Sequence, residues 1–403
     1  MSEDVFDPQS LDFISDPYPV YDRLRASKPI FFHEASQLWF CTRYDDVDAL
    51  LRDRRLGRSI DHVISREARG LPPEPAEYRP FTKLSANSMF DKEPPDHTRL
   101  KMLVHKAFTP RRVKRLQGRI QALADELLDR VQPQREMDII ADFATPLPVT
   151  VIAELLGVPP ADRHYLRPWS QAIVAMYELD HSQEQARRAV QAASDFSDYL
   201  RHLARRRREA PEDDLITALA FVEEAGDQLS EDELIATCVL LLNAGHEATV
   251  NVIGNGMLAL LQHPAQWRAL QDEPSLVVTA VEEMMRYDTP LQLFRRWILE
   301  DMEYKGISFK QGMQVGLMFG AANRDPARFD HPHIFDTRRQ ENPHISFGAG
   351  VHYCLGAPLA RLELQIALGT LARRLPDMKL AGPAPRFRPA YVIRGLEALP
   401  VTF

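Results

Sequence analysis

The order of apolar and polar residues predicts a chain that is mainly helical, with short strands near its two ends. Residues 30–33 and 38–42 are short runs rich in aromatic and apolar side chains, which favour strands. Similar runs lie within residues 294–319, and Tyr391-Val-Ile393 predicts a last strand. The long region between them has helical periodicity. We therefore expect a mainly α fold with small β-sheets.

The strongest helix signal starts at Ser230, where Ser-Glu-Asp-Glu233 forms a capping box before the apolar residues 234–242. The helix is predicted to end at His263-Pro264, which gives a length of about 50 Å at 1.5 Å per residue. Because it is apolar on nearly all sides, we expect it to pass through the interior. The segment Ala244-Gly-His-Glu-Ala-Thr249 places polar groups in this buried span, where burial is costly, so we expect function there.

The composition is that of a globular protein with a sizeable core: 403 residues, of which 45% are hydrophobic and 26% charged. No repeat or low-complexity linker divides residues 1–403, so we predict a single domain. The net charge of −8 gives no general attraction to nucleic acid. Met1 to Asp7 lack the basic and apolar regions of a signal peptide, and residues 234–242 are about half a membrane span. We expect a cytoplasmic protein without a membrane or nucleic acid partner.

Cys354 is the cysteine whose surroundings indicate chemistry. The chain has three cysteines, too few and too far apart for a disulfide framework. Gly348 and Gly350 allow a tight turn before Cys354, and a helix is predicted from Leu359. The N–H groups at a helix N-terminus stabilise a thiolate, and Gly356 lets this backbone approach the sulfur.

Three interpretations of Cys354 follow from these residues. It could be a buried, inert thiol. It could bind zinc together with histidines, although His331, His333, His344 and His352 do not form the close ligand pairs typical of zinc sites. It could also be a thiolate that is exposed to a partner on one side, which the turn and the following helix favour.

The segment Phe347-Gly-Ala-Gly-Val-His-Tyr-Cys354-Leu-Gly356 resembles the heme-binding signature of the cytochrome P450 family, F-G-x-G-x-H-x-C-x-G, at every fixed position. The resemblance extends from Asp16 to Val401 and is closest to soluble bacterial members. It implies an α-rich fold with heme b (iron protoporphyrin IX) between the long central helix and the C-terminal cysteine helix. Cys354 would be the metal ligand, and Phe347, Gly348 and Gly356 would surround the cofactor.

Glu283 and Arg286 support this resemblance independently. They are three residues apart, share a helix face, and resemble the E-x-x-R pair of the family. The resemblance implies that the pair holds the core beneath the heme, and we predict Arg338 as the third member of this network.

The propionates of the heme need cationic or hydrogen-bonding partners. His97 and Lys101 resemble the family's H-x-x-x-R, with lysine in place of arginine, so that a point charge replaces a bidentate fork. The resemblance implies that His97, Lys101, Arg296 and His352 bind the propionates.

The buried segment 244–249 resembles the motif A-G-x-[DE]-T-[TS], in which a carboxylate and a threonine hydroxyl deliver protons. Glu247 matches the carboxylate, but Ala248 stands where the threonine is usual. Thr249 lies about 100° further round the helix and cannot simply substitute. We expect Glu247, Ala248 and Thr249 to be the catalytic positions and hypothesise that a hydroxyl on the substrate completes the proton relay.

The resemblance implies an oxidoreductase, a monooxygenase that inserts one atom of O2 into a lipophilic small molecule such as a terpenoid, macrolide, fatty acid or steroid. An apolar pocket suits such a substrate. The resemblance implies that its lining includes Phe81, Leu84, Met89, Phe90, Leu241, Ala244, Leu291, Phe294, Val392 and Ile393. A peroxide-driven or rearranging heme-thiolate enzyme and a non-catalytic heme sensor remain alternatives.

Electrons are expected from a ferredoxin with an NAD(P)H-dependent ferredoxin reductase, because the residues after the heme signature leave no room for a fused flavin reductase. Residues 97–124 contain eight Lys or Arg and no Asp or Glu, and we predict that this segment docks the ferredoxin. The run Arg205 to Arg208 is interpreted as a solvated helix end.

Overall fold

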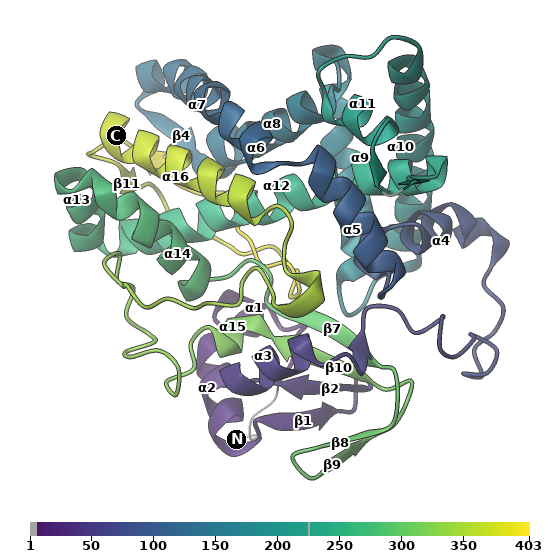
Figure 1. Ribbon diagram of the computed structural model, residues 1–403. Helices are drawn as coiled ribbons and strands as arrows, with labels where there is room; N and C mark the ends of the chain where they lie inside the picture. Colours follow the sequence, from purple (N-terminus) through teal and green to yellow (C-terminus); the bar gives the residue numbers. More distant parts are fainter. Residues whose placement is uncertain (1–5, 225) are drawn as a thin grey trace.

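The computed structural model describes residues 6–224 and 226–403, so residues 1–5 of the acidic N-terminal stretch lie outside it. Most helices form one large part of the molecule, and a smaller part contains α1, α2, α3, α15 and the largest sheet (Figure 1). The mainly α fold with small sheets is confirmed.

The α-helices have the following bounds. They are α1 (Leu11–Ser15), α2 (Tyr18–Ser27), α3 (Tyr44–Arg52), α4 (Arg79–Ala86), α5 (Asp96–Ala107), α6 (Pro110–Arg115), α7 (Gln117–Val131), α8 (Pro146–Leu156), α9 (Leu166–Val174), α10 (Gln183–Glu209), α11 (Leu215–Ala220), α12 (Glu231–Gln262), α13 (Pro264–Asp272), α14 (Val277–Tyr287), α15 (Phe319–Ala322) and α16 (Ala357–Arg374).

The largest sheet joins segments from both ends of the chain. Its five strands lie in the order β1 (Ile30–His33), β2 (Leu38–Cys41), β10 (Gln314–Met318), β7 (Leu293–Ile298) and β3 (Leu56–Gly57). The strand β10 pairs parallel with β2 and antiparallel with β7. A three-stranded sheet contains β11 (Lys379–Leu380), β12 (Pro400–Thr402) and β4 (Glu136–Asp138), and two hairpins contain β5 (Glu223–Glu224) with β6 (Asp227–Gln228) and β8 (Met302–Tyr304) with β9 (Ile307–Phe309).

The prediction of a strand at residues 391–393 is wrong. A single isolated bridge joins Ile393 to Leu291 there. The carboxylate of Glu178 instead accepts hydrogen bonds from the N–H groups of Tyr391 and Val392, both at 2.9 Å, and of Ile393, at 3.1 Å. Because a side chain satisfies these donors, the segment needs no neighbouring strand.

The central helix α12 has the predicted boundaries. Ser230 and Glu233 form the capping box, with hydrogen bonds of 3.2 and 2.9 Å. The helix crosses the middle of the molecule (Figure 1) and packs against α8, α10, α14 and α16. Within residues 234–260, Ala244 and Ala248 are the exposed positions. They lie one turn apart, so this face of an otherwise buried helix borders a hollow.

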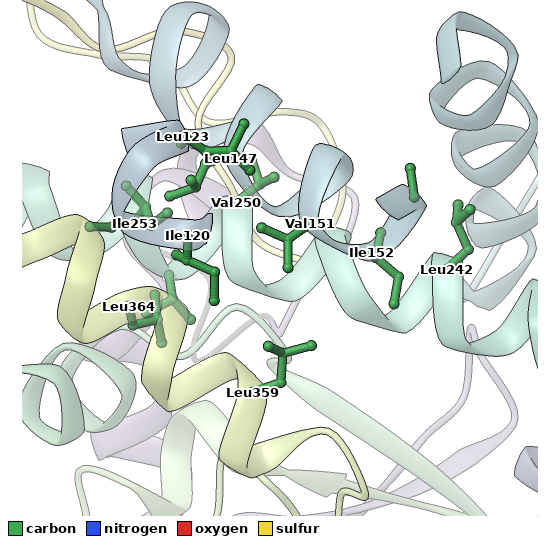
Figure 2. Packing of buried hydrophobic residues seen from close by; sticks show 14 of the residues in the cluster. Ile120, Leu123, Leu147, Val151, Ile152, Leu242, Val250, Ile253, Leu359 and Leu364 are labelled. Atoms are coloured by element: carbon green, nitrogen blue, oxygen red, sulfur yellow. The ribbon is translucent and has the colours of Figure 1, made fainter. Parts of the chain in front are cut away.

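The main core lies where α7, α8, α12 and α16 meet. Figure 2 shows apolar side chains from these helices in one cluster: Ile120, Leu123, Leu147, Val151, Ile152, Leu242, Val250, Ile253, Leu359 and Leu364. The segment Ile139–Leu156, which includes α8, is long and apolar enough to cross a membrane, but 67% of it is buried in this interior. The packing fixes α16, and with it the cysteine loop that precedes α16, relative to α12.

Candidate active site

The loop before α16 brings Cys354 to the start of a helix. Gly348 and Gly350 both have a φ of +69°, in the region that favours glycine. A Cβ on Gly350 would lie 2.6 Å from the carbonyl oxygen of Leu51, so no other residue fits without a shift. The N–H of Cys354 donates to the carbonyl of Phe347 at 3.0 Å. The two glycines therefore shape the turn that ends at the thiol.

The Cys354 sulfur differs from the other two thiols of the chain. Burial raises the pKa of Cys354, but hydrogen bonds from the N–H groups of Gly356 and Ala357 and the charge of Lys101 oppose this rise. Cys41 and Cys238 are fully buried, and burial raises the pKa of both thiols well above the usual range. Helix N–H groups aimed at a sulfur are suited to a thiolate ligand.

A zinc site at Cys354 is not supported. Within residues 6–224 and 226–403, no group of three or more His, Cys, Asp or Glu side chains could hold a metal ion together. The described residues therefore do not supply the three or four ligands that a zinc site uses.

A cationic cluster lies beside the cysteine loop. The rings of His97 on α5 and His352 are 4.3 Å apart, and Nδ1 of His97 is buried without a hydrogen-bond partner in the described residues. Arg296 on β7 is 2% exposed, and its guanidinium donates to the carbonyl of Arg295 at 3.3 Å. Burial and the neighbouring charges of His352, Lys101 and Arg296 lower the pKa of His97 to about 4. Burial and Arg58 lower the pKa of Arg296 to about 9.

Glu93 and Arg58 complete this cluster, and the sequence interpretation missed both. The Glu93 carboxylate accepts hydrogen bonds from the N–H of Arg58 and, at 3.5 Å, from Nε2 of His352. Lys101 donates to the carbonyls of Val351 and Tyr353 at 2.6 and 3.0 Å, which ties α5 to the cysteine loop. The sequence did contain one signal for Glu93: it lies only four residues before His97, which is already predicted to bind the cofactor.

The site fits heme on three observations. Three cations, Arg58, Lys101 and Arg296, outnumber the two carboxylates, Glu93 and Asp91, and such an excess favours an anionic group such as two propionates. The orphaned Nδ1 of His97 offers a hydrogen-bonding atom to that group. The Cys354 thiol, with two N–H donors aimed at it, suits one face of a flat macrocycle. The face of α12 that carries only the small side chains of Ala244 and Ala248 suits the other face.

Glu283 and Arg286 form a buried ion pair beside the cysteine loop. Both side chains are 0% exposed, and Arg286 donates to both carboxylate oxygens at 2.7 Å. Arg286 also donates to the carbonyls of Asn323, Pro332 and Ile334.

The prediction of Arg338 as the third member is wrong, because Arg339 takes this place. Arg339 Nε donates to Glu283 at 3.1 Å, whereas Arg338 is 54% exposed and pairs with Glu273 at 2.6 Å. The N–H of Asp336 donates to Glu283, and a turn from Asp336 to Arg339 places Arg338 at its outer tip. Arg339, the last residue of the turn, therefore points toward Glu283, and Arg338 points away from it.

The polar residues of α12 are held in different ways. Glu247 is 8% exposed; burial favours its neutral form, but the charges of His246, Arg388 and Arg167 outweigh burial and lower the pKa of Glu247. Thr249 is buried, and its hydroxyl donates to the carbonyl of Gly245 at 3.4 Å. Thr249 thus bonds to its own helix and does not replace a hydroxyl at the exposed position of Ala248.

The residues predicted to line a substrate pocket are only partly brought together. Phe90 packs edge-on against Phe294, with ring centroids 5.7 Å apart, and Leu291 pairs with Ile393. The others lie in or against the apolar clusters: Phe81, Leu84, Met89 and Leu241 in the main core, Val392 in the cluster around Tyr21, and Ala244 at the hollow.

The basic segment 97–124 is largely neutralised in the fold. Acidic residues from distant parts of the chain pair with Arg99, Lys106, Arg112, Arg115 and Arg119. Among the described residues, Arg111 and Lys114 have no ion-pair partner. The interpretation of Arg205 to Arg208 as a solvated helix end is wrong for Arg207, which is 5% exposed and pairs with Asp214.

Comparisons with known proteins point to one family. A family model described as Cytochrome P450 matches residues 164–376. The chain is 42% identical to the polyketide biosynthesis cytochrome P450 PksS of Bacillus subtilis (strain 168), over 100% of this chain and 99% of that protein. It is 40% identical to vitamin D(3) 25-hydroxylase of Pseudonocardia autotrophica, over 97% and 94% of the two chains. The crystal structure of P450BioI in complex with an acyl carrier protein ligated to hexadec-9Z-enoic acid matches with a TM-score of 0.91 at 40% identity, over 98% and 99%.

Proposed function

The chain belongs to the cytochrome P450 family of heme-dependent monooxygenases, and we propose that Cys354 is the ligand of its heme iron. The observation that carries this proposal is the Cys354 thiol with the N–H groups of Gly356 and Ala357 aimed at it. Heme bound there would supply O2 activation, in which two electrons and two protons place one oxygen atom in the substrate and the other in water. His97, Lys101, Arg296 and His352 would bind the propionates, while Phe347 and Gly348 border the cofactor.

We propose a lipophilic substrate that carries a hydroxyl group, from the class of fatty acyl or polyketide chains or steroid-like molecules. The relatives support this range: one is named for polyketide biosynthesis, another is a vitamin D(3) 25-hydroxylase, and one structural neighbour holds a hexadecenoic acid on a carrier protein. A screen of lipophilic compounds for spectral shifts of the heme tests this class. Shifts with hydrophilic compounds alone would contradict it.

The missing hydroxyl at Ala248 leads to a prediction about coupling. In the unmodified enzyme, a hydroxyl-bearing substrate should yield product for most of the NADPH consumed. Its deoxy analogue should yield product for a small fraction and release peroxide, because Thr249 bonds to Gly245 and offers no hydroxyl at the hollow. Ala248→Thr should raise the product formed per NADPH more for the deoxy analogue than for the native substrate. The measurement is product and peroxide formed per NADPH; equal coupling of both substrates in the unmodified enzyme would rule out substrate assistance.

We further propose that electrons come from a ferredoxin and its NAD(P)H-dependent reductase, and that the protein works in the cytoplasm. The exposed side chains of Met102, Val351 and Tyr353 accompany the cysteine loop, and Arg111 and Lys114 are unpaired cations on the neighbouring α6. An apolar centre with basic residues beside it suits an acidic electron carrier. Turnover with peroxide alone, and none with ferredoxin, would favour the peroxide-driven alternative.

The docking proposal predicts that reversing either unpaired charge on α6 weakens the binding of ferredoxin but leaves the binding of substrate unchanged. Arg111→Glu and Lys114→Glu should each raise the apparent Michaelis constant for ferredoxin severalfold and weaken its salt dependence, because they reverse unpaired charges. Substrate-induced spectral shifts should not change. Lys28→Glu, at the exposed residue directly after α2, makes the same charge change in the smaller part of the molecule and serves as the matched control. Reduction rates that are unchanged across an ionic-strength series would eliminate this docking face.

A further inference from the structure

His246 occupies a buried position on α12, directly before the proposed catalytic Glu247. Its side chain is 2% exposed. Nδ1 of its ring lies 2.7 Å from the carbonyl oxygen of Leu242, one turn earlier on the helix. A carbonyl oxygen only accepts hydrogen bonds, so Nδ1 carries the hydrogen. The helix itself therefore fixes the tautomer of this ring.

The second ring nitrogen of His246 faces the catalytic carboxylate. Nε2 lies 3.4 Å from Oε1 of Glu247 and has no hydrogen-bond partner among the described residues. If the ring were neutral, Nε2 would direct a lone pair at a carboxylate oxygen in a buried space, which is unfavourable. A proton between the two atoms removes this conflict and makes the contact an attractive pair.

The other side of Glu247 is held by groups that cannot give up a proton. Nη1 of Arg388 lies 3.9 Å from Oε2, and Nη2 of Arg388 donates to Asn251 at 2.8 Å. Asn251 in turn donates to the backbone carbonyl of Glu247 at 2.8 Å. A Cβ on Gly395 would lie 2.0 Å from Oδ1 of Asn251, so a glycine is needed where the C-terminal loop meets this arrangement.

The charged groups that act on Glu247 are therefore His246, Arg388 and Arg167. An arginine side chain does not deprotonate in proteins. Of these three groups, His246 is the one whose ring nitrogen can give a proton to the carboxylate and take one back.

We propose that His246 is a positioning residue that stores a proton for Glu247 and so offsets the hydroxyl missing at Ala248. This inference rests on the proposed monooxygenase function. In each transfer the N–H bond at Nε2 breaks and an O–H bond forms at Oε1 of Glu247; that O–H bond then breaks in turn, and the two protons delivered in this way end in the water molecule that the reaction forms. Solvent returns a proton to Nε2 before the second transfer. The electrons come from the ferredoxin.

The protonation state can be measured without turnover. Protein labelled with ¹⁵N-histidine, reduced and bound to carbon monoxide so that it is diamagnetic, should show one histidine with hydrogen on both ring nitrogens at neutral pH. His246→Gln should remove that signal and so assign it. Glu247→Gln should convert the ring to a neutral form with hydrogen on Nδ1. A neutral His246 in the unmodified protein, or a ring unaffected by Glu247→Gln, would overturn the proposal.

Two variants separate proton storage from a structural role. The amide of His246→Gln reaches the position of Nε2 and can donate to Glu247, whereas that of His246→Asn lies near Nδ1 and can donate only to Leu242. In the unmodified enzyme, product per NADPH should fall as the pH rises and the pair loses its proton. Both variants should show low coupling without this pH dependence. Restoration of the unmodified pH profile by His246→Gln would refute proton storage.

Failure of this inference and failure of the proposed function would look different. The absorption spectrum of the carbon monoxide complex reports on heme ligation, whatever the state of His246. A normal spectrum and turnover with a neutral His246 would reject the proton store alone. An abnormal spectrum together with the predicted histidine signals would reject the proposed heme ligand and leave the His246–Glu247 pair in place.

Discussion

Cys354→Ala is expected to abolish the strongly red-shifted Soret band of the reduced, carbon monoxide-bound protein and all oxygenation of substrate. The thiolate is the proposed iron ligand, and an alanine methyl group cannot coordinate a metal. The loss should therefore be complete and not partial. The measurement is the difference absorption spectrum of the reduced protein with and without carbon monoxide.

Cys238→Ala is the matched control for this experiment. Cys238 lies on α12, is 1% exposed, and differs from Cys354 in having no helix N-terminus behind its sulfur. The control should keep the red-shifted band, although removal of a buried sulfur lowers the stability slightly. A band that persists in Cys354→Ala would contradict the assignment of the ligand.

Glu283→Ala is expected to lower the free energy of unfolding by about 3–5 kcal/mol, the usual cost of leaving one partner of a buried ion pair unpaired. Glu283 and Arg286 are both 0% exposed, and Glu283 also accepts hydrogen bonds from Arg339, Asn342 and the N–H of Asp336. Arg286 and these three residues would each lose the Glu283 carboxylate as a hydrogen-bond acceptor. Urea unfolding followed by circular dichroism and by heme absorbance measures the change.

Two adjacent arginines provide a test of this network within one turn. Arg339→Ala should destabilise the protein by about 1–3 kcal/mol, because it removes a buried, charge-assisted hydrogen bond to Glu283. Arg338→Ala should leave the unfolding free energy nearly unchanged, because its ion pair with Glu273 is exposed. Equal decreases in the unfolding free energy of the two variants would show that the wrong arginine has been assigned to the network.

The features that could be predicted from the sequence are those that depend on neighbouring residues. The capping box at Ser230 and the apolar run after it define α12, and its end follows from Pro264. The turn at Gly348 and Gly350 and the helix that follows Cys354 are likewise written within a short segment. Local backbone preferences decide all of these features.

The features that could not be predicted depend on contacts between distant segments. Glu178 replaces a strand partner for residues more than two hundred positions away. The acidic partners of Arg99 and Arg112 in the basic segment are Asp227 and Asp213, over a hundred residues further along the chain. The choice of Arg339 over Arg338 depends on a turn that the composition of the segment does not reveal. In each case the tertiary fold, and not a local preference, selects the partner.

The single carboxylate of Glu178 has a mechanical consequence. It lies in the connection between α9 and α10 and grips three successive amides of the C-terminal loop, while Arg295 donates to the carbonyl of Tyr177 in the same connection. One side chain thus joins the connection between α9 and α10 to the C-terminal loop, and loss of its carboxylate would leave three successive amides without that acceptor at once. The backbone geometry of residues 391–393 therefore depends on a single residue more than two hundred positions earlier in the chain.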